Sequence, residues 1–497
     1  MSLIADRPAG SPAESRRIPR PAVLVAALGT VGIVVSLMQT LVIPIVPLLP
    51  GLLGTDATNA SWVVTATLLA GAVAMPISGR LGDMFGKRRM VLVSLLMLVT
   101  GSLVCALASS LAPVIVGRVL QGFATGAIAL GISIMRDELP PERVGSAIAS
   151  MSATFGVGSA VGLPLAAVIA QHAHWHVLFW TSAGLGAVCA VLVFTLVPES
   201  PVRTPARFDY LGAVGLSVTL VALLVVITKG TAWGWSSRRV LGLSALAAVA
   251  ALLWGWYELR RTAPLVDLRV SARPRVLLTN LASIAVGFAL YGMSLTFPQL
   301  LLAPTATGHG FGLSMIEAGL ALAPTGLLMM LLSPVSARVT AARGPKLTLA
   351  LGAMVLGLGY LSATLWTGAV WQIVLAACTV AAGVGLAYSA MPALIMGAVP
   401  VTETAAANGL NALMRAIGTS TSAAVMSAVL ANLTVGVAGD RLPSREGFVV
   451  AFLVSGAAAV LAVLITVFIP ATRPYPGRAS RARVGSRAQV SFHPDSA

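Results

Sequence analysis

The stretch GRLGDMFGKRR, residues 79–89, carries five charged side chains in a chain that is otherwise strongly apolar. It lies between two long apolar runs, near 61–79 and 90–108. Gly82 and Gly86 permit a tight turn, because glycine adopts backbone angles that other residues avoid. We interpret the stretch as a short, basic hairpin loop that joins two membrane-spanning helices.

The composition of the chain indicates that its natural solvent is a lipid bilayer. Hydrophobic residues make up 57% of the 497 residues and charged residues only 10%, whereas a soluble domain has about 25% charged residues. A single soluble core stops growing at about 250–300 residues. The 49 glycines also fit membrane helices, in which glycine is frequent.

Apolar runs long enough to cross a bilayer recur along the whole chain. A helix needs about 20 apolar residues to span the hydrocarbon core, and a strand of a membrane barrel needs only about ten. The runs therefore predict an all-α polytopic membrane protein. Pro44, Pro47 and Pro50 predict that the outer end of the first span is bent or unwound. The fourteen expected spans lie near 22–49, 61–79, 90–108, 112–134, 145–170, 176–197, 210–229, 239–257, 276–302, 316–337, 347–366, 371–395, 404–432 and 448–469.

The distribution of basic residues predicts the orientation of the chain. With the N-terminus in the cytoplasm, the inner segments hold 25 Lys and Arg residues and the outer loops hold five. The other two, Arg118 and Arg415, fall within spans. The positive-inside rule then predicts that both termini are cytoplasmic. The net charge of +16 follows from this topology, and no basic patch interleaved with aromatic residues indicates a nucleic-acid partner.

A short internal repeat divides the chain into two halves. PISGRLGDMFGKRR (76–89) resembles PVSARVTAARGPK (334–346) at an offset of 258 residues, but Asp83 falls on Ala341. Repeated halves of this kind are common in transporters. The expected organisation is a cytoplasmic N-terminal segment (1–21), an N-terminal six-helix half (22–200), two inserted helices with linkers (201–275), a C-terminal six-helix half (276–470) and a disordered basic cytoplasmic tail (471–497).

The chain resembles the major facilitator superfamily, in particular its fourteen-span drug/proton antiporter branch. GRLGDMFGKRR (79–89) matches the family's loop 2–3 signature, and VIVGRVLQGFATGAIA (114–129) matches its fourth-span Arg-x-x-Gln-Gly element. GVGSAVGLPLAAVIA (156–170) resembles the fifth-span antiporter motif, although Leu163 separates its Gly162 and Pro164. The resemblance implies a major facilitator fold in a bacterial plasma membrane. It also implies efflux of amphiphilic drugs or natural products, by alternating access, in exchange for protons.

The resemblance further implies that the loop at 79–89 is a conformational latch. Asp83 is expected to dock on the N-terminus of span 13, near 402–405, where the helix dipole and free N–H groups favour an anion. Arg80 is expected to pair with Asp137 at the inner end of span 4. The candidate latch residues are Gly79, Arg80, Asp83, Gly86, Lys87, Arg88 and Asp137.

Two arginines lie inside spans, where a charged side chain costs at least about 2.5–3.5 kcal/mol. Arg118 and Gln121 share one helical face of span 4, and Asn411 and Arg415 belong to a polar stripe along span 13. The resemblance implies a role in proton transfer for Arg118. The alternative for Arg118 is a guanidinium that only extends to the nearer membrane interface or braces a carbonyl group. The alternative for the stripe of span 13 is a polar seam that is purely structural. The candidates for proton coupling or for lining the cavity are Arg118, Gln121, Asp137 and Arg415.

Small residues recur at every fourth position of span 5, which allows another helix to approach closely. The resemblance implies that Gly158, Gly162 and Pro164 form a hinge that seals the interface between the halves. Ordinary tight packing is the alternative.

Aromatic and amide residues within spans are candidates to contact a small amphiphilic substrate. They are Gln39, Trp62, Asn280, Tyr291, Gln299, Tyr388 and Asn411.

The chain lacks an acid that many members of this branch carry in the first span. Gln39 stands about where that acid would be, in SLMQTLVIPIVPLLP (36–50). A proton carrier must titrate, and glutamine cannot. Three accounts of how transport is driven therefore remain open. They are proton coupling through Asp83, Asp137 and Arg118, proton coupling through Glu317, and an uncoupled or differently driven facilitator.

Other classes of function have less support in the sequence. It contains no H-E-x-x-H, G-x-S-x-G or Walker A pattern, so neither an enzyme nor ATP-driven transport is expected. The three cysteines lack the spacing of a metal site, and we expect no metal or cofactor. A non-transporting receptor of the same fold is the remaining alternative. The expected partners are a small amphiphilic substrate, protons and membrane lipid, and the protein is expected to be a monomer.

Overall fold

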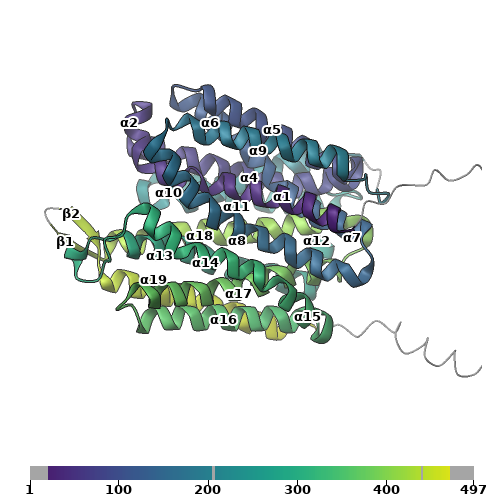
Figure 1. Cartoon of the computed structure of the whole chain (residues 1–497). Coiled ribbons are helices and arrows are strands. Elements are labelled where there is room, and N and C mark those ends of the chain that lie inside the picture. The colour runs from purple at the N-terminus through teal and green to yellow at the C-terminus, as the bar shows by residue number, and fades with distance from the viewer. Residues whose placement is uncertain (1–20, 204–206, 438–439, 471–497) are drawn as a thin grey trace, which may run out of the picture.

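A computed structural model describes residues 21–203, 207–437 and 440–470. These residues form one bundle of long helices (Figure 1). The first helix begins and the last helix ends at the same face of the bundle. The expectations for residues 1–20 and for the tail at 471–497 lie outside the described residues.

The helices follow the expected spans closely. The N-terminal half contains α1 (Pro21–Thr40), η1 (Ile43–Leu48), α2 (Leu49–Leu53), α3 (Ala57–Ala60), α4 (Trp62–Phe85), α5 (Lys87–Leu107), α6 (Leu111–Gly122), η2 (Phe123–Thr125), α7 (Gly126–Glu138), α8 (Pro141–His172) and α9 (His176–Leu196). The inserted region contains α10 (Tyr210–Trp233), α11 (Arg238–Arg260) and α12 (Leu268–Ser271). The C-terminal half contains α13 (Pro274–Leu302), η3 (Thr305–Thr307), α14 (Met315–Leu331), α15 (Ser333–Arg343), α16 (Pro345–Leu365), α17 (Val370–Met396), η4 (Val401–Glu403), α18 (Thr404–Asn432), β1 (Thr434–Val437), β2 (Asp440–Pro443) and α19 (Arg445–Phe468).

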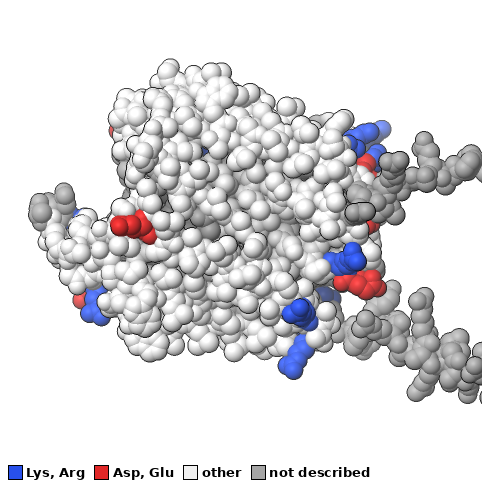
Figure 2. All heavy atoms as spheres, viewed as in Figure 1, with Lys and Arg blue, Asp and Glu red and all other residues white. Residues whose placement is uncertain are grey.

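Thirteen helical segments of the described chain are long and apolar enough to cross a membrane. They coincide with thirteen of the expected spans. The expected span at 145–170 is covered by α8, a helix of 32 residues, which is not among these thirteen, so the count of fourteen stays a prediction. The face of the molecule in Figure 2 is uncharged over most of its length, and Lys, Arg, Asp and Glu gather at its two ends. This pattern fits a bundle whose middle lies in lipid.

Three spans depart from a continuous α-helix. In one of them, the span at Met315–Arg343, α14 ends at Leu331 and α15 begins at Ser333. As predicted, the first span unwinds where its prolines begin: α1 ends at Thr40, and the 3₁₀ helix η1 follows at Ile43–Leu48. Proline lacks the N–H that an α-helix needs. The sequence did not predict that span 4 is interrupted by η2, directly after Gln121 and Gly122. A 3₁₀ stretch inside a long helix often marks a hinge.

The inserted helices lie at the edge of the bundle and connect to both halves. α10 shares a buried apolar cluster with α4 and α18, which includes Leu69, Leu220 and Leu413. α11 packs mainly on α10, and Leu252 on its outer side is 74% exposed. An exposed apolar surface on the outside of a membrane bundle faces lipid.

The internal repeat is visible in the backbone. Gly86 joins α4 to α5 with φ +113°, and Gly344 joins α15 to α16 with φ +86°. Both angles lie in the region that favours glycine. The two copies of the loop therefore share the same helix–glycine–helix joint.

A β-hairpin that no sequence pattern indicated follows α18. β1 and β2 pair in antiparallel fashion from Thr434↔Pro443 to Val437↔Asp440, at one end of the bundle (Figure 1). A ring nitrogen of His309 lies 3.1 Å from the carbonyl oxygen of Pro443 and joins the hairpin to the loop after α13. Four-residue strands are too short to give a clear period-two pattern.

Candidate functional site

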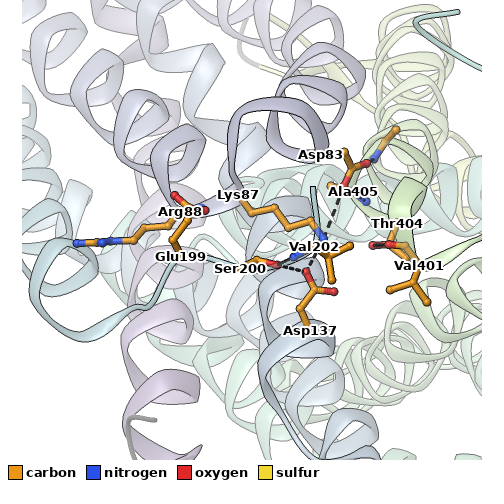
Figure 3. Close-up of polar contacts among 11 residues, drawn as sticks. Asp83, Lys87, Arg88, Asp137, Glu199, Ser200, Val202, Val401, Thr404 and Ala405 are labelled. Carbon is orange, nitrogen blue, oxygen red and sulfur yellow. Dashed lines mark hydrogen bonds and ion pairs between the residues drawn. The ribbon is translucent and has the colours of Figure 1, made fainter. Parts of the chain in front are cut away.

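Asp83 joins the two halves of the protein at one face of the bundle. It lies in the last turn of α4, and its Oδ2 accepts a hydrogen bond from the N–H of Ala406 at 2.9 Å. Its Oδ1 accepts a longer hydrogen bond, of 3.4 Å, from the N–H of Ala405 (Figure 3). These groups belong to the first turn of α18, where N–H groups lack acceptors within the helix and the dipole favours an anion. The contact expected for Asp83 is therefore present.

Lys87 lies between two buried carboxylates. Its Nζ is 2.5 Å from Oδ2 of Asp137 and 3.6 Å from Oδ1 of Asp83, and all three side chains are at most 1% exposed. Ser200 donates a further hydrogen bond of 2.5 Å to Oδ2 of Asp137. Figure 3 shows the lysine side chain extended between the ends of α4 and α7. We call Asp83, Lys87 and Asp137 the latch triad.

The expected ion pair between Arg80 and Asp137 is wrong. Lys87 pairs with Asp137 instead, because the turn at Gly86 points the first residue of α5 back toward α7. Arg80 lies on the side of α4 that faces α18 and the linker before α13. There it lines a cavity of about 220 Å³ together with residues 262–267 and Glu403.

Glu199 holds the start of α5 and was not among the candidate residues predicted from the sequence. Its two carboxylate oxygens accept hydrogen bonds from the N–H groups of Arg88 at 3.1 Å and Arg89 at 3.3 Å. A Cβ on Gly86 would lie 2.7 Å from Oε1 of Glu199, at the end of a side chain that can shift, so it is the φ of +113° that requires glycine at this position. Glu199 and Ser200 directly follow the apolar run at 176–197, and this polar pair was the sequence feature that could have indicated a contact here.

Arg88 was a candidate for the latch, but its side chain points away from the triad. Its Nη2 donates to the carbonyl oxygen of Phe194 at 2.5 Å, and its guanidinium lies 5.4 Å from the centre of that ring. Arg88 therefore fastens α5 to α9 within one half.

Close backbone contact accompanies the charged contact between α4 and α18. A Cβ on Gly79 would lie 2.8 Å from the carbonyl carbon of Ala405 and 3.0 Å from Cα of Ala406. A Cβ on Gly409 would lie 3.1 Å from the carbonyl carbon of Met75. Only glycine permits this approach, because backbone atoms cannot move aside as a flexible side chain can.

We expect Gly79→Ala to reduce the export that the family resemblance implies at least about tenfold. The added methyl group would hold α18 away from α4, and overpacking of this kind costs about 1–3 kcal/mol. Gly29→Ala in α1 is the matched control, because nothing lies within 4 Å of the position of its Cβ. Export should be measured at equal amounts of folded protein. If the two variants export equally well, the close approach at Gly79 has no part in the transport cycle.

Arg118 is buried within the N-terminal half. Its Nε donates to the carbonyl oxygen of Val63 at 3.0 Å, and its Nη1 donates to Oε1 of Gln121 at 2.7 Å. Gln121 in turn donates to Oγ of Ser102 at 2.7 Å. In the described part of the chain, Arg118 forms no ion pair with a carboxylate. The geometry supports the alternative in which Arg118 braces a carbonyl group.

Arg415 occupies a related position in the C-terminal half. Its Nη1 donates to Oδ1 of Asn411 at 2.5 Å, and its guanidinium lies 5.1 Å from the centre of the Tyr388 ring. Asn411 donates to Oδ1 of Asn280 at 2.9 Å and to Oγ of Ser283 at 2.8 Å. Three of the candidate substrate residues thus gather around Arg415.

Within the described residues, no hydrogen bond or ring contact links the other candidate substrate residues to Arg415 or Asn411. Trp62 lies at the start of α4, where the ammonium group of Lys229 is 4.7 Å from the centre of its ring. Gln39, Tyr291 and Gln299 are half-buried.

The small residues of α8 pack in two directions. A Cβ on Gly158 would lie 2.6 Å from Cβ of Ser36, and one on Gly162 would overlap the Thr40 side chain, so both glycines allow close contact with α1 in the same half. Pro164 faces the other half, because a Cβ on Gly319 in α14 would lie 3.2 Å from Cγ of this proline. Of the three expected hinge residues, only Pro164 lies at the interface between the halves.

The family model described as Major Facilitator Superfamily matches residues 28–423. An uncharacterized MFS-type transporter of Mycobacterium tuberculosis is 31% identical over 61% of this chain. The match spans only 44% of that relative's length. The tetracenomycin C resistance and export protein of Streptomyces glaucescens is 29% identical over 88% of this chain and 81% of its own length.

Solved structures share the fold. The human organic anion transporter MFSD10 superposes with a TM-score of 0.64 at 17% sequence identity, and the match covers 90% of this chain and all of that one. A likeness at this identity supports the arrangement of the helices alone.

Proposed function

The chain belongs to the major facilitator superfamily, and we propose that it exports small amphiphilic compounds across the bacterial plasma membrane in exchange for protons. The observation that carries the proposal is the contact of Asp83 in α4 with the first turn of α18. It joins the two halves at one face, which is what alternating access requires of a closed gate. The export named for the relative from Streptomyces glaucescens supports a drug or natural product as the substrate.

The latch has a strength suited to reversible opening. A hydrogen bond to a charged group contributes about 1.5–3 kcal/mol, and Asp83 accepts two from α18. A few kcal/mol is enough to favour one state strongly and still allow the other to be populated. We propose that the face carrying the latch is cytoplasmic and that the latch holds it closed while the opposite face is open.

The latch triad also offers a route for proton coupling. Lys87 is shared between Asp83 and Asp137. A proton on Asp83 would remove the negative charge that α18 binds and so weaken the docking. We propose that proton release and binding at the triad accompany closing and opening of the cytoplasmic face.

Glu317 is less suited to carry the proton. Its carboxylate accepts the N–H of Ser314 at 2.8 Å, and its own N–H donates to Oγ of Ser314 at 3.2 Å. This capping box accounts for the glutamate by a local role at the start of α14.

Reconstituted protein tests both parts of the proposal. Proteoliposomes should export an amphiphilic dye faster under an imposed proton gradient, and adding the dye to purified protein in weak buffer should release protons. Asp137→Asn should reduce this release. Export that is unchanged by collapse of the gradient, with no proton release, would contradict proton exchange and favour the uncoupled facilitator. Absence of dye movement would contradict export itself.

A further inference from the structure

The guanidinium of Arg415 is buried without a counter-ion. Arg415 is 8% exposed. In the described part of the chain, the polar and ring contacts of its guanidinium are the hydrogen bond from Nη1 to Asn411 and the ring of Tyr388. Nε and Nη2 therefore keep free N–H donors, arranged in the planar fork that fits a carboxylate. A buried cation without a partner is costly, which indicates a group that is paired only when a ligand is bound.

Asn408 gives a second, independent indication of a ligand. It is 3% exposed, and neither oxygen nor nitrogen of its amide has a hydrogen-bond partner within the described residues. Asn408 and Arg415 are seven residues apart on α18, so they lie on the same face two turns apart. Buried polar groups are rarely left unpaired.

This face of α18 lies toward the middle of the protein. Gly409 contacts α4, Asn411 contacts α13, and Leu413 packs in the cluster with α10. Asn408 and Arg415 lie on the side of α18 between its contact with α4 and its contact with α13. This side points away from α10. Tyr388, which lies beside Arg415, belongs to α17, and its carbonyl oxygen accepts a hydrogen bond of 3.2 Å from Ser152 in α8. Arg415 thus lies close to the interface between the two halves.

Among the described residues, no carboxylate lies at the level of Arg415 along the membrane helices. Every described acid in the membrane helices lies near a helix end: Asp83, Asp137, Glu138, Glu142, Glu258, Glu317 and Glu446. Glu403, the acid nearest to Arg415 along the chain, is twelve positions away, or about 18 Å along the helix. The field near Arg415 is therefore positive and repels a cationic substrate.

We propose that the substrate is an amphiphilic organic anion whose acidic group, a carboxylate or an ionised phenol, binds Arg415 and Asn408. The inference rests on the proposed export function and names its substrate class. The apolar body of the compound lies between the halves beside Tyr388. A lipophilic cation, the other common class of exported drug, has no carboxylate to bind at this depth.

Two dyes with the same xanthene scaffold test this charge preference. Proteoliposomes containing the full chain should transport fluorescein, an anion, and its affinity should exceed that of cationic rhodamine 6G at least about tenfold. Arg415→Gln should weaken fluorescein binding about ten- to a hundredfold, because charged hydrogen bonds are lost. Arg415→Lys should retain part of the affinity, since it keeps the charge and loses the fork.

Two further variants keep the test decisive. Arg441→Gln removes an exposed cation of the β-hairpin and should leave both dyes unaffected. Asn408→Ala should weaken fluorescein binding even if Arg415→Gln does not fold. Wild-type protein that moves rhodamine 6G but not fluorescein would overturn the anion inference and leave export intact. Unchanged fluorescein affinity in folded Arg415→Gln would also overturn it, and movement of neither dye would overturn both proposals.

Discussion

Asp83→Asn is expected to leave the protein folded and inserted while export falls at least about tenfold. Asparagine has nearly the shape of aspartate but no charge and only one acceptor oxygen. One of the hydrogen bonds from Ala405 and Ala406 is therefore lost, and the other falls from a charge-assisted strength of about 1.5–3 kcal/mol to about 1 kcal/mol. Lys87 would at the same time lose one of its two carboxylate partners. The face that carries the latch then fails to stay closed, and the cycle stops.

Export by this variant should be compared with wild type at matched protein levels in the membrane. Asp267→Asn is a suitable control, because Asp267 caps the short helix α12 through the N–H groups of Arg269 and Val270 and makes no contact with the triad. Full export by Asp83→Asn would contradict the latch and leave the loop only its role in membrane topology.

Lys87→Met is expected to lower the free energy of unfolding by about 3–5 kcal/mol, the typical cost of removing one partner of a buried ion pair. Methionine preserves the length of the side chain but leaves Asp83 and Asp137 facing each other, each at most 1% exposed and without their shared cation. Chemical unfolding in detergent micelles, followed by tryptophan fluorescence, measures the change.

Arg89→Met is the matched control for this loss of charge. Arg89 is two residues further along α5, its side chain is 68% exposed, and its ion pair with Glu199 is 3.9 Å long. Exposed pairs contribute about 0–1 kcal/mol, so this variant should remain close to wild type. The double variant Lys87→Met with Asp137→Asn should recover part of the stability. Equal stabilities of the two single variants would contradict a buried triad.

The sequence was sufficient to predict the helices and the partner of Asp83. Apolar runs define the spans because lipid leaves a helix no other way to satisfy its backbone, and the resemblance placed Asp83 at the start of α18. The sequence could not predict which basic side chain pairs with Asp137. Arg80 and Lys87 are both basic and lie in the same loop, and only the turn at Gly86 decides which of them reaches α7.

Contacts between segments far apart in the chain were also beyond the sequence. Glu199 binds the start of α5 across more than a hundred residues, and no local pattern encodes that distance. The polar stripe of α18 was recognised from its spacing, but its partners Asn280, Ser283 and Tyr388 come from other helices. The small residues of α8 pack on α1 in one direction and on α14 in the other, and this also depends on where those helices lie.

A distance across the face that carries the latch, which we propose is cytoplasmic, tests the latch and alternating access together. Phe85 at the end of α4 and Val401 before α18 are 50% and 48% exposed, so both can carry spin labels after Cys105, Cys189 and Cys378 are replaced. Wild-type protein should show a predominant short distance, and Asp83→Asn should shift the population to a longer one. Identical distance distributions in the two folded proteins would contradict a face held closed by Asp83.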